Sequence, residues 1–121
     1  MDNLNSVELK AFVPAKDFAL SKQFYQDVGF VMASDGDGVA YFHHGQCSFL
    51  LQDYFPPTLA DNLMLHWLVE DVAAWHQLLT RKAVAATYQV KMTDIVEQPW
   101  GMREFFLYDP SGVLWRIAQN I

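Results

Sequence analysis

Residues 63–82 read LMLHWLVEDVAAWHQLLTRK. The apolar run at 63–69 is typical of a buried β-strand, and Asp71, soon after it, is a favoured helix N-cap. The next apolar residues recur on one helical face, and they are Val72, Trp75, Leu78 and Leu79. Arg81 and Lys82 place positive charge at the helix C-terminus, where the helix dipole favours it. This stretch therefore predicts a strand followed directly by an amphipathic helix.

The same order of elements occurs in the first half of the chain. A strand is expected at 7–15, and Asp17 is a second candidate N-cap. The helix after it has an apolar residue at every fourth position, namely Leu20, Phe24 and Val28. Gly29 is expected to end this helix, because glycine readily adopts the positive φ of a helix C′ position.

Three short strands are predicted after each helix. In the first half they lie at 30–33, 39–43 and 47–52, and the two glycines of the turn at 35–38 are expected to supply the positive φ angles of a hairpin. In the second half the predicted strands are 87–91, 103–108 and 113–119, with loops at 97–101 and 109–112.

The fold class expected from this order is α+β, with two βαβββ modules in one domain spanning 1–121. Module 1 covers 7–53, a linker covers 54–62, and module 2 covers 63–120. A single βαβββ unit leaves one face of its sheet bare, so two units must pack together within a chain or between chains. We expect a cup-like open sheet with the helices outside, in a homodimer. An undifferentiated α+β domain is the alternative.

Composition excludes several classes of partner. The formal charge is −6 and the isoelectric point about 4.9, so the surface should repel nucleic acid and anionic membranes. No apolar run approaches the ~20 residues of a membrane span, and residues 1–5 lack the features of a signal peptide. A cytoplasmic location is expected. Aromatic residues make up 15 % of the chain, which predicts that some of them line a groove or a subunit interface.

The sequence has no Gly-rich phosphate loop, GxSxG elbow, CxxC pair or HExxH helix, and its single cysteine allows no intramolecular disulfide. Cys47 lies in an apolar run and is expected to be a buried thiol. The pair His43-His44 is expected to be solvated at a strand end, and His76 to lie on the exposed side of its helix. His66 is different, because it lies within a predicted strand, where it is either a core residue or a ligand contact.

Motifs at both ends resemble one known family. The second half has Glu97-Gln98-Pro99-Trp100-Gly101-Met102-Arg103-Glu104-Phe105, then Asp109-Pro110-Ser111-Gly112 and Arg116-Ile117-Ala118-Gln119-Asn120. The first half has Phe12-Val13-Pro14-Ala15-Lys16-Asp17, Phe24-Tyr25 and Val28-Gly29-Phe30, and Asp61-Asn62-Leu63 precedes the fifth strand. These residues are similar to the glyoxalase, dioxygenase and bleomycin-resistance superfamily, also called the vicinal-oxygen-chelate superfamily. Within it they most resemble bleomycin-resistance-type binding proteins.

The resemblance implies a cup without the metal of the superfamily's enzymes. Those enzymes hold a divalent ion with His or Glu on four strands, and the corresponding positions here are Lys10, Gln52, Met64 and Arg116. None of these side chains is a good ligand for such an ion, and two are cations. The resemblance therefore implies no metal site and no cofactor.

The ligand site that the resemblance implies is centred on Trp100. Phe12, His66 and Leu114 fall on the matching sides of their strands, and Gln52 is near the same cup. Lys10 and Arg116 also belong to this expected site. Buried cations must be paired, so these two either pair with acids such as Glu104 or meet an anionic group of the ligand.

The predicted function is non-catalytic binding of a small molecule. The ligand is expected to be aromatic or amphipathic and drug-like, and the resemblance implies a cationic drug such as bleomycin. Two alternatives remain open from the sequence. One is an atypical enzyme of the same superfamily, such as an isomerase, lyase or ring-cleaving oxygenase, and the other is a protein-interaction module that uses exposed aromatic residues.

Overall fold

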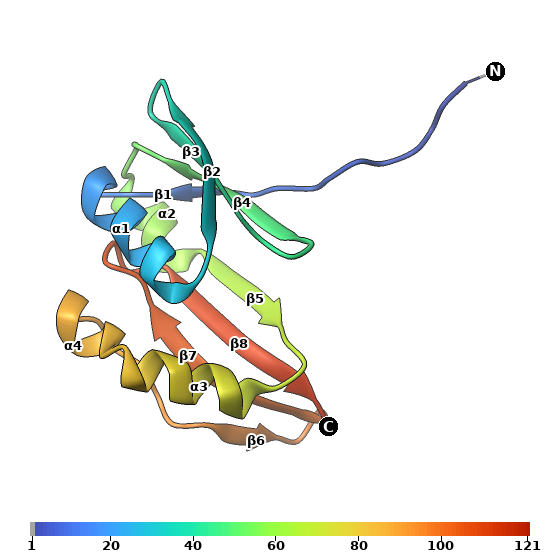
Figure 1. Ribbon diagram of the computed structural model, residues 1–121, viewed down its shortest axis with the longest axis vertical. Helices are drawn as coiled ribbons and strands as arrows, with labels where there is room; N and C mark the ends of the chain where they lie inside the picture. Colours follow the sequence, from blue (N-terminus) through green and yellow to red (C-terminus); the bar gives the residue numbers. More distant parts are fainter. Residues whose placement is uncertain (1) are drawn as a thin grey trace.

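The computed structural model describes residues 2–121 and contains two four-stranded mixed sheets (Figure 1). Module 1 consists of β1 (Phe12–Pro14), α1 (Phe18–Val28), β2 (Val31–Gly36), β3 (Val39–His44) and β4 (Cys47–Gln52). Helix α2 (Pro57–Asn62) follows. Module 2 consists of β5 (Met64–Leu68), α3 (Val72–Arg81), α4 (Val84–Tyr88), β6 (Val96–Gln98), β7 (Met102–Tyr108) and β8 (Leu114–Asn120).

The two sheets have the same topology. Their strand orders are β1-β4-β3-β2 and β5-β8-β7-β6, and the first strand of each module runs parallel to the last. In Figure 1, α1 lies beside the first sheet, and α3 and α4 lie beside the second. The predicted α+β fold with two βαβββ modules is confirmed. No helix of residues 2–121 is long and apolar enough to cross a membrane.

The two long helices begin at the residues that the sequence predicts. Asp17 accepts a hydrogen bond from the Leu20 N–H at 3.1 Å, and Asp71 accepts one from the Ala74 N–H at 3.0 Å. Gly29 ends α1 with a φ of 131°. The prediction for the apolar face of α1 was partly wrong, because Leu20 is exposed and the buried residues are Ser21, Phe24, Tyr25 and Val28.

The first strand is much shorter than the predicted 7–15. Its register with β4 begins at Phe12 opposite Leu50, and residues 2–11, here called the N-terminal arm, form no strand. Figure 1 shows the arm projecting far from the rest of the chain. The Leu50 N–H still donates to the Ala11 carbonyl at 3.0 Å, and further along the arm Glu8 contacts Tyr41 and Ser48 through its side chain.

The prediction of a strand at 87–91 was wrong, because α4 extends to Tyr88 and residues 89–91 form no strand. Val84 and Tyr88 lie four residues apart and are both buried, and the Tyr88 hydroxyl donates to the Asp27 carboxylate at the end of α1. Packing against α1 thus overrides the β-propensity of this segment. The second strand of module 2 is instead β6, which overlaps the part predicted as a loop. The linker also contains a helix, α2, with Pro57 in its first turn.

The hairpin between β2 and β3 has positive φ at Asp37 and Gly38, with φ values of 55° and 77°. The sequence prediction assigned this role to the two glycines, but Gly36 ends β2. A two-residue loop with both residues at positive φ matches the right-handed twist of the strands, and Asp-Gly is a favoured pair for it.

A hydrogen-bond network joins the two modules through their shared aromatic core. The Tyr25 hydroxyl of α1 donates to Asp109 Oδ2 at 2.5 Å and accepts from Trp115 Nε1 at 2.9 Å. Asp109 Oδ1 also accepts the backbone N–H groups of Ser111 and Val113. The predicted core positions of Trp67 and Trp115 are confirmed, and Trp75 packs against them half-buried.

Candidate ligand site

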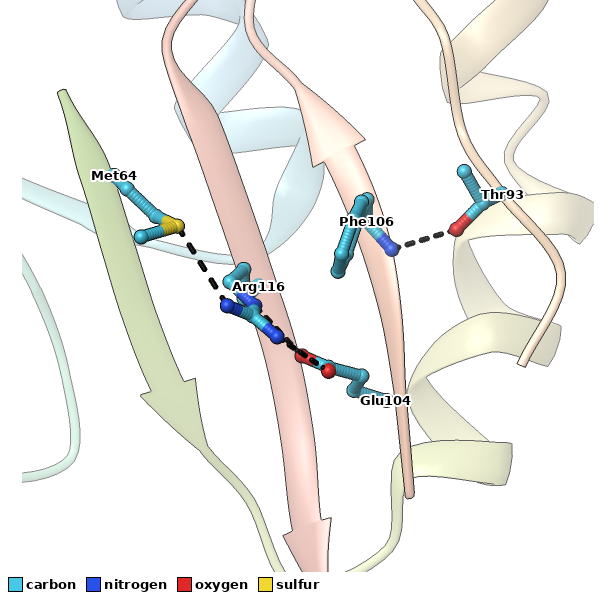
Figure 2. Close-up of polar contacts among 5 residues, drawn as sticks. All are labelled: Met64, Thr93, Glu104, Phe106 and Arg116. Carbon is cyan, nitrogen blue, oxygen red and sulfur yellow. Dashed lines mark hydrogen bonds and ion pairs between the residues drawn. The ribbon is translucent and has the colours of Figure 1, made fainter. Parts of the chain in front are cut away.

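One face of the second sheet carries most of the candidate residues. Side chains on a strand alternate between faces, and the buried Trp67, Phe105 and Trp115 occupy the face that packs on the helices. The opposite face, here called the module 2 face, consists of Met64, His66, Glu104, Phe106, Leu114 and Arg116. Figure 2 shows Met64, Arg116 and Glu104 close together across β5, β8 and β7.

A bidentate ion pair lies at the centre of this face. Arg116 Nε donates to Glu104 Oε1 at 2.9 Å, and Nη2 donates to Oε2 at 2.6 Å (Figure 2). The Glu104 side chain is 1 % exposed and the Arg116 side chain 22 %. Hydrogen bonds from Arg116 lower the pKa of the Glu104 carboxyl, although burial opposes this shift. Of the two alternatives left open by the sequence for Arg116, the structure shows pairing with Glu104.

Trp100 is presented at the edge of this face by a tight hairpin. The loop between β6 and β7 is 99–101, closed by a hydrogen bond from the Gly101 N–H to the Gln98 carbonyl at 3.2 Å. Gly101 has a φ of 83°, the left-handed conformation expected at the end of a three-residue hairpin loop. The Trp100 side chain is 59 % exposed. Its ring centroid lies 5.9 Å from Arg116 Cζ, and the Phe106 centroid lies 5.1 Å from the same atom.

His66 and Leu114 also lie on the module 2 face. His66 is exposed on β5 directly opposite Arg116, and Leu114 is half-buried opposite Met64. His66 also borders a cavity of about 270 Å³ that reaches Phe30. The structure therefore brings Trp100, His66, Leu114 and Arg116 together on one sheet.

Lys10, Phe12 and Gln52 form a separate group on the first sheet. Phe12 of β1 is half-exposed and shares a face with its register partner Leu50 of β4. Gln52 is the last residue of β4. Lys10 Nζ lies 2.6 Å from Glu8 Oε1 and 5.4 Å from the centre of the Tyr41 ring. Lys10 is thus paired with an acid, as Arg116 is.

Glu8 and Tyr41 are site candidates that the sequence analysis missed. The Tyr41 hydroxyl donates to Glu8 at 2.8 Å, and the Ser48 hydroxyl donates to the same oxygen. Together with Lys10, these donors lower the pKa of the Glu8 carboxyl to about 2. Glu8 and Lys10 are two residues apart, a spacing that places side chains on one side of an extended chain. The spacing of Glu8 and Lys10 in the sequence thus indicates that their side chains lie together. Nothing in the sequence indicates that Tyr41 lies opposite them.

Three other predictions were wrong. Cys47 is exposed rather than buried, because it begins β4 beside the turn. His44 is not solvated but packs its ring 5.1 Å from Trp75 and 5.6 Å from Trp67. His76 faces the sheet, where its ring lies 4.9 Å from Phe105 and its Nε2 hydrogen-bonds the Thr93 carbonyl oxygen at 3.1 Å.

The residues at the superfamily's metal positions do not fit a divalent ion. Met64 offers only a thioether, which lies 3.8 Å from Arg116 Nη1, and Lys10 and Arg116 carry N–H donors rather than lone pairs. Within residues 2–121 no three His, Cys, Asp or Glu side chains are grouped closely enough to hold a metal.

Comparison with known proteins gives one family and many similar folds. The family model described as the glyoxalase/bleomycin resistance protein/dioxygenase superfamily matches residues 4–117. A search of curated protein sequences gave no match. A bleomycin-binding protein solved in complex with bleomycin superposes with a TM-score of 0.82 at 22 % identity, over 96 % of this chain and 100 % of that one.

Two further structures represent different functions on the same fold. TnmS3, an antibiotic binding protein from Streptomyces sp. CB03234, has a TM-score of 0.77 at 24 % identity, over 98 % of this chain and 100 % of its own. Lactoylglutathione lyase from Agrobacterium tumefaciens has a TM-score of 0.69 at 18 % identity, over 97 % of this chain and 96 % of its own. At these identities the likeness establishes the fold, and the function must be argued from the residues.

Proposed function

Because the chain belongs to the glyoxalase/bleomycin resistance protein/dioxygenase superfamily, we propose that it is a non-catalytic protein that sequesters a small aromatic or amphipathic molecule. The observation that carries this proposal is Trp100, an indole 59 % exposed on a hairpin loop that holds it beside the module 2 face. An exposed tryptophan on a short, closed loop loses little conformational freedom when a flat ligand stacks on it.

The chemistry of the face supports binding rather than catalysis. Its one acid, Glu104, is held ionised by Arg116 and has both oxygens occupied. A general acid or base needs a proton that it can exchange near neutral pH, and the lowered pKa of Glu104 opposes that role. Similar folds solved as a bleomycin-binding protein and an antibiotic binding protein agree with the proposal.

A thermal-shift screen tests this function. The panel contains planar aromatic compounds of both charges and small acids, each measured with and without chelator. A ligand at about 100 times its Kd stabilises the native state by about 2.7 kcal/mol, so at least one aromatic compound should raise the melting temperature, and chelator should not reduce the rise. A panel without any aromatic hit would contradict the proposal. A rise that chelator abolishes would favour a metal-dependent enzyme instead.

The protein is also proposed to act as a homodimer. In the single chain, Leu4, Val7 and Leu9 of the N-terminal arm are between 90 and 98 % exposed, and the module 2 face is open to solvent. Apolar side chains on an extended arm gain free energy only when another surface covers them. A second copy of the chain can cover the arm and lie opposite the module 2 face across the ligand site, which is why we assign it as the partner.

Light scattering at tens of micromolar tests the dimer. The intact chain should give twice the mass of one chain. The interface of such a dimer should bury at least the ~1,200 Å² expected of a specific contact. The double variant Val7→Asp/Leu9→Asp should shift it toward the monomer, because charge opposes apolar burial. Leu20→Asp, at an exposed position of α1, is the control and should remain dimeric. A monomeric intact chain would contradict the proposal.

A further inference from the structure

Arg116 already occupies the place that a cation would take on the module 2 face. Its Cζ lies 5.1 Å from the Phe106 ring centre and 5.9 Å from that of Trp100, both within the roughly 6 Å over which a cation is attracted to an aromatic face. A cationic ligand stacking on either ring would therefore meet a fixed guanidinium at short range. Like charges brought together in a partly desolvated site repel strongly.

Glu104 offsets this repulsion only in part, because an incoming ligand approaches the guanidinium side of the pair. Both of its oxygens accept from Arg116, at 2.9 and 2.6 Å, and its side chain is 1 % exposed. The ion pair thus has its carboxylate inward and its guanidinium outward. The next acid on the same sheet, Glu97, faces the opposite side, where Arg103 Nη2 lies 2.9 Å from its Oε1. A molecule approaching the face meets the positive end of the pair.

Arg116 keeps one nitrogen that lacks a good acceptor. Among residues 2–121, the hydrogen-bonding contact of Nη1 is with Met64 Sδ at 3.8 Å (Figure 2). A thioether is a weak acceptor, whereas an anionic oxygen gives a short, charge-assisted hydrogen bond. Met64 is 54 % exposed and unbranched, so it can move aside. His66, the register partner of Arg116, adds no negative charge.

From these contacts we infer that the module 2 face selects planar aromatic ligands carrying an anionic oxygen group, such as a carboxylate or sulfonate, and disfavours planar cations. The ring stacks on Trp100, and the oxygen accepts from Arg116 Nη1. This inference rests on the proposed binding function and names its ligand class. It reverses the ligand charge expected from the sequence, because Arg116 is fixed in the position that a cationic ligand would need.

Two flat tricyclic probes of opposite charge test the inference. They are 9-anthracenecarboxylate and protonated 9-aminoacridine, with the Kd of each measured by calorimetry for the intact chain. Loss or gain of one close charge contact changes affinity by about tenfold or more. The carboxylate should therefore bind at least about tenfold more tightly than the acridine. Equal or tighter binding of the acridine would overturn the inference.

Variants then show whether Arg116 sets the preference. Arg116→Met should reverse it, because Glu104 becomes an unpaired carboxylate. The double variant Arg116→Met/Glu104→Leu removes both charges. Its Kd values for the two probes should agree within about threefold. It also provides the comparison if the single variant folds poorly. Arg103→Met removes the same charge from the other side of the sheet and should keep the original preference.

The outcomes separate this inference from the function on which it rests. If both probes bind but Arg103→Met and Arg116→Met change the preference equally, net charge sets it and the inference is wrong, while the binding function stands. If neither probe binds the intact chain or any variant at millimolar concentration, both the inference and the proposed ligand face are wrong.

Discussion

Trp100 is the residue whose substitution best separates a ligand contact from a structural role. Its side chain is 59 % exposed, and its ring centroid lies 5.9 Å from Arg116 Cζ. Trp100→Ala removes a stacking surface, so affinity for a ligand found in the screen should fall by about 1–3 kcal/mol, or roughly 5- to 150-fold. Stability should change by about 0.5 kcal/mol or less, as for other exposed positions.

Trp75 provides the matched comparison. Its ring lies 4.7 Å from Trp67 and 5.1 Å from His44, and it is in contact range of a Cβ built on Gly29. Trp75→Ala should therefore cost about 3 kcal/mol or more of stability by leaving a cavity. Chemical denaturation gives the stabilities, and calorimetry gives the affinities. If Trp100→Ala lowers stability as much as Trp75→Ala, Trp100 is a structural residue.

At this scale the sequence predicts which residues lie on a face but not what they touch. His66, Leu114 and Arg116 share one face of the second sheet, because strand alternation fixes their side. The pairing of Arg116 with Glu104 was one of two alternatives, because it depends on the register between β7 and β8. His44 and Cys47 were predicted wrongly because their surroundings come from distant elements of the chain.

Among the secondary-structure elements, those with local signals were predicted best. Helices α1 and α3 begin at their capping aspartates, and β4 has the predicted bounds. These features depend on residues a few positions apart. The short α4 and β6 were missed because each is stabilised by contacts with another element, α1 in one case and β7 in the other. The start of β1 at Phe12, five residues later than predicted, likewise has no local signal in the sequence.

The backbone conformation of Gly101 shapes the hairpin loop at 99–101. Gly101 has a φ of 83°, a conformation that costs an L-residue about 1–2 kcal/mol. Gly101→Ala should therefore lower the free energy of unfolding by that amount. It should also weaken ligand binding, because the loop that holds Trp100 would relax. Thermal or chemical denaturation, together with the affinity, measures both effects.

Gly36→Ala is the control for that variant. Gly36 has no positive φ, and a Cβ built on it meets no atom within 4 Å. Replacing it should leave stability unchanged or raise it by up to about 1 kcal/mol, because alanine reduces the entropy of the unfolded chain. If the two glycine variants lose the same stability, backbone strain at Gly101 is not what shapes the loop.

For the whole molecule, the repeat of the two modules could be predicted but their junction could not. The order of strands and helices along the chain implies two equivalent sheets, as observed. The junction depends on Tyr25 of module 1, which lies 84 residues from its partner Asp109 in module 2. No local pattern in the sequence points to that contact. The same holds for the N-terminal arm, whose direction depends on contacts with β3 and β4.

Tyr25→Phe tests how much this junction stabilises the fold. The substitution removes a donor from the buried Asp109 carboxylate and an acceptor from the Trp115 indole N–H. Leaving buried polar groups unpaired costs about 1–3 kcal/mol each, so the variant should lose at least that much stability at neutral pH. Tyr41→Phe is the control, because its hydroxyl also donates to a carboxylate, but one on the exposed arm. Its stability should change little.

The pH dependence of the Tyr25→Phe deficit identifies its cause. Burial raises the pKa of Asp109, and the hydrogen bond from Tyr25 opposes that shift. A carboxyl with a raised folded-state pKa destabilises the fold above that pKa, and the penalty is relieved as the pH falls through it. The Tyr25 hydroxyl is most valuable while Asp109 is ionised, so the deficit should be largest at neutral pH and shrink in acid. A deficit that stays constant down to the pH at which Asp109 is protonated would mean that lost packing, not the carboxylate contact, destabilises the variant.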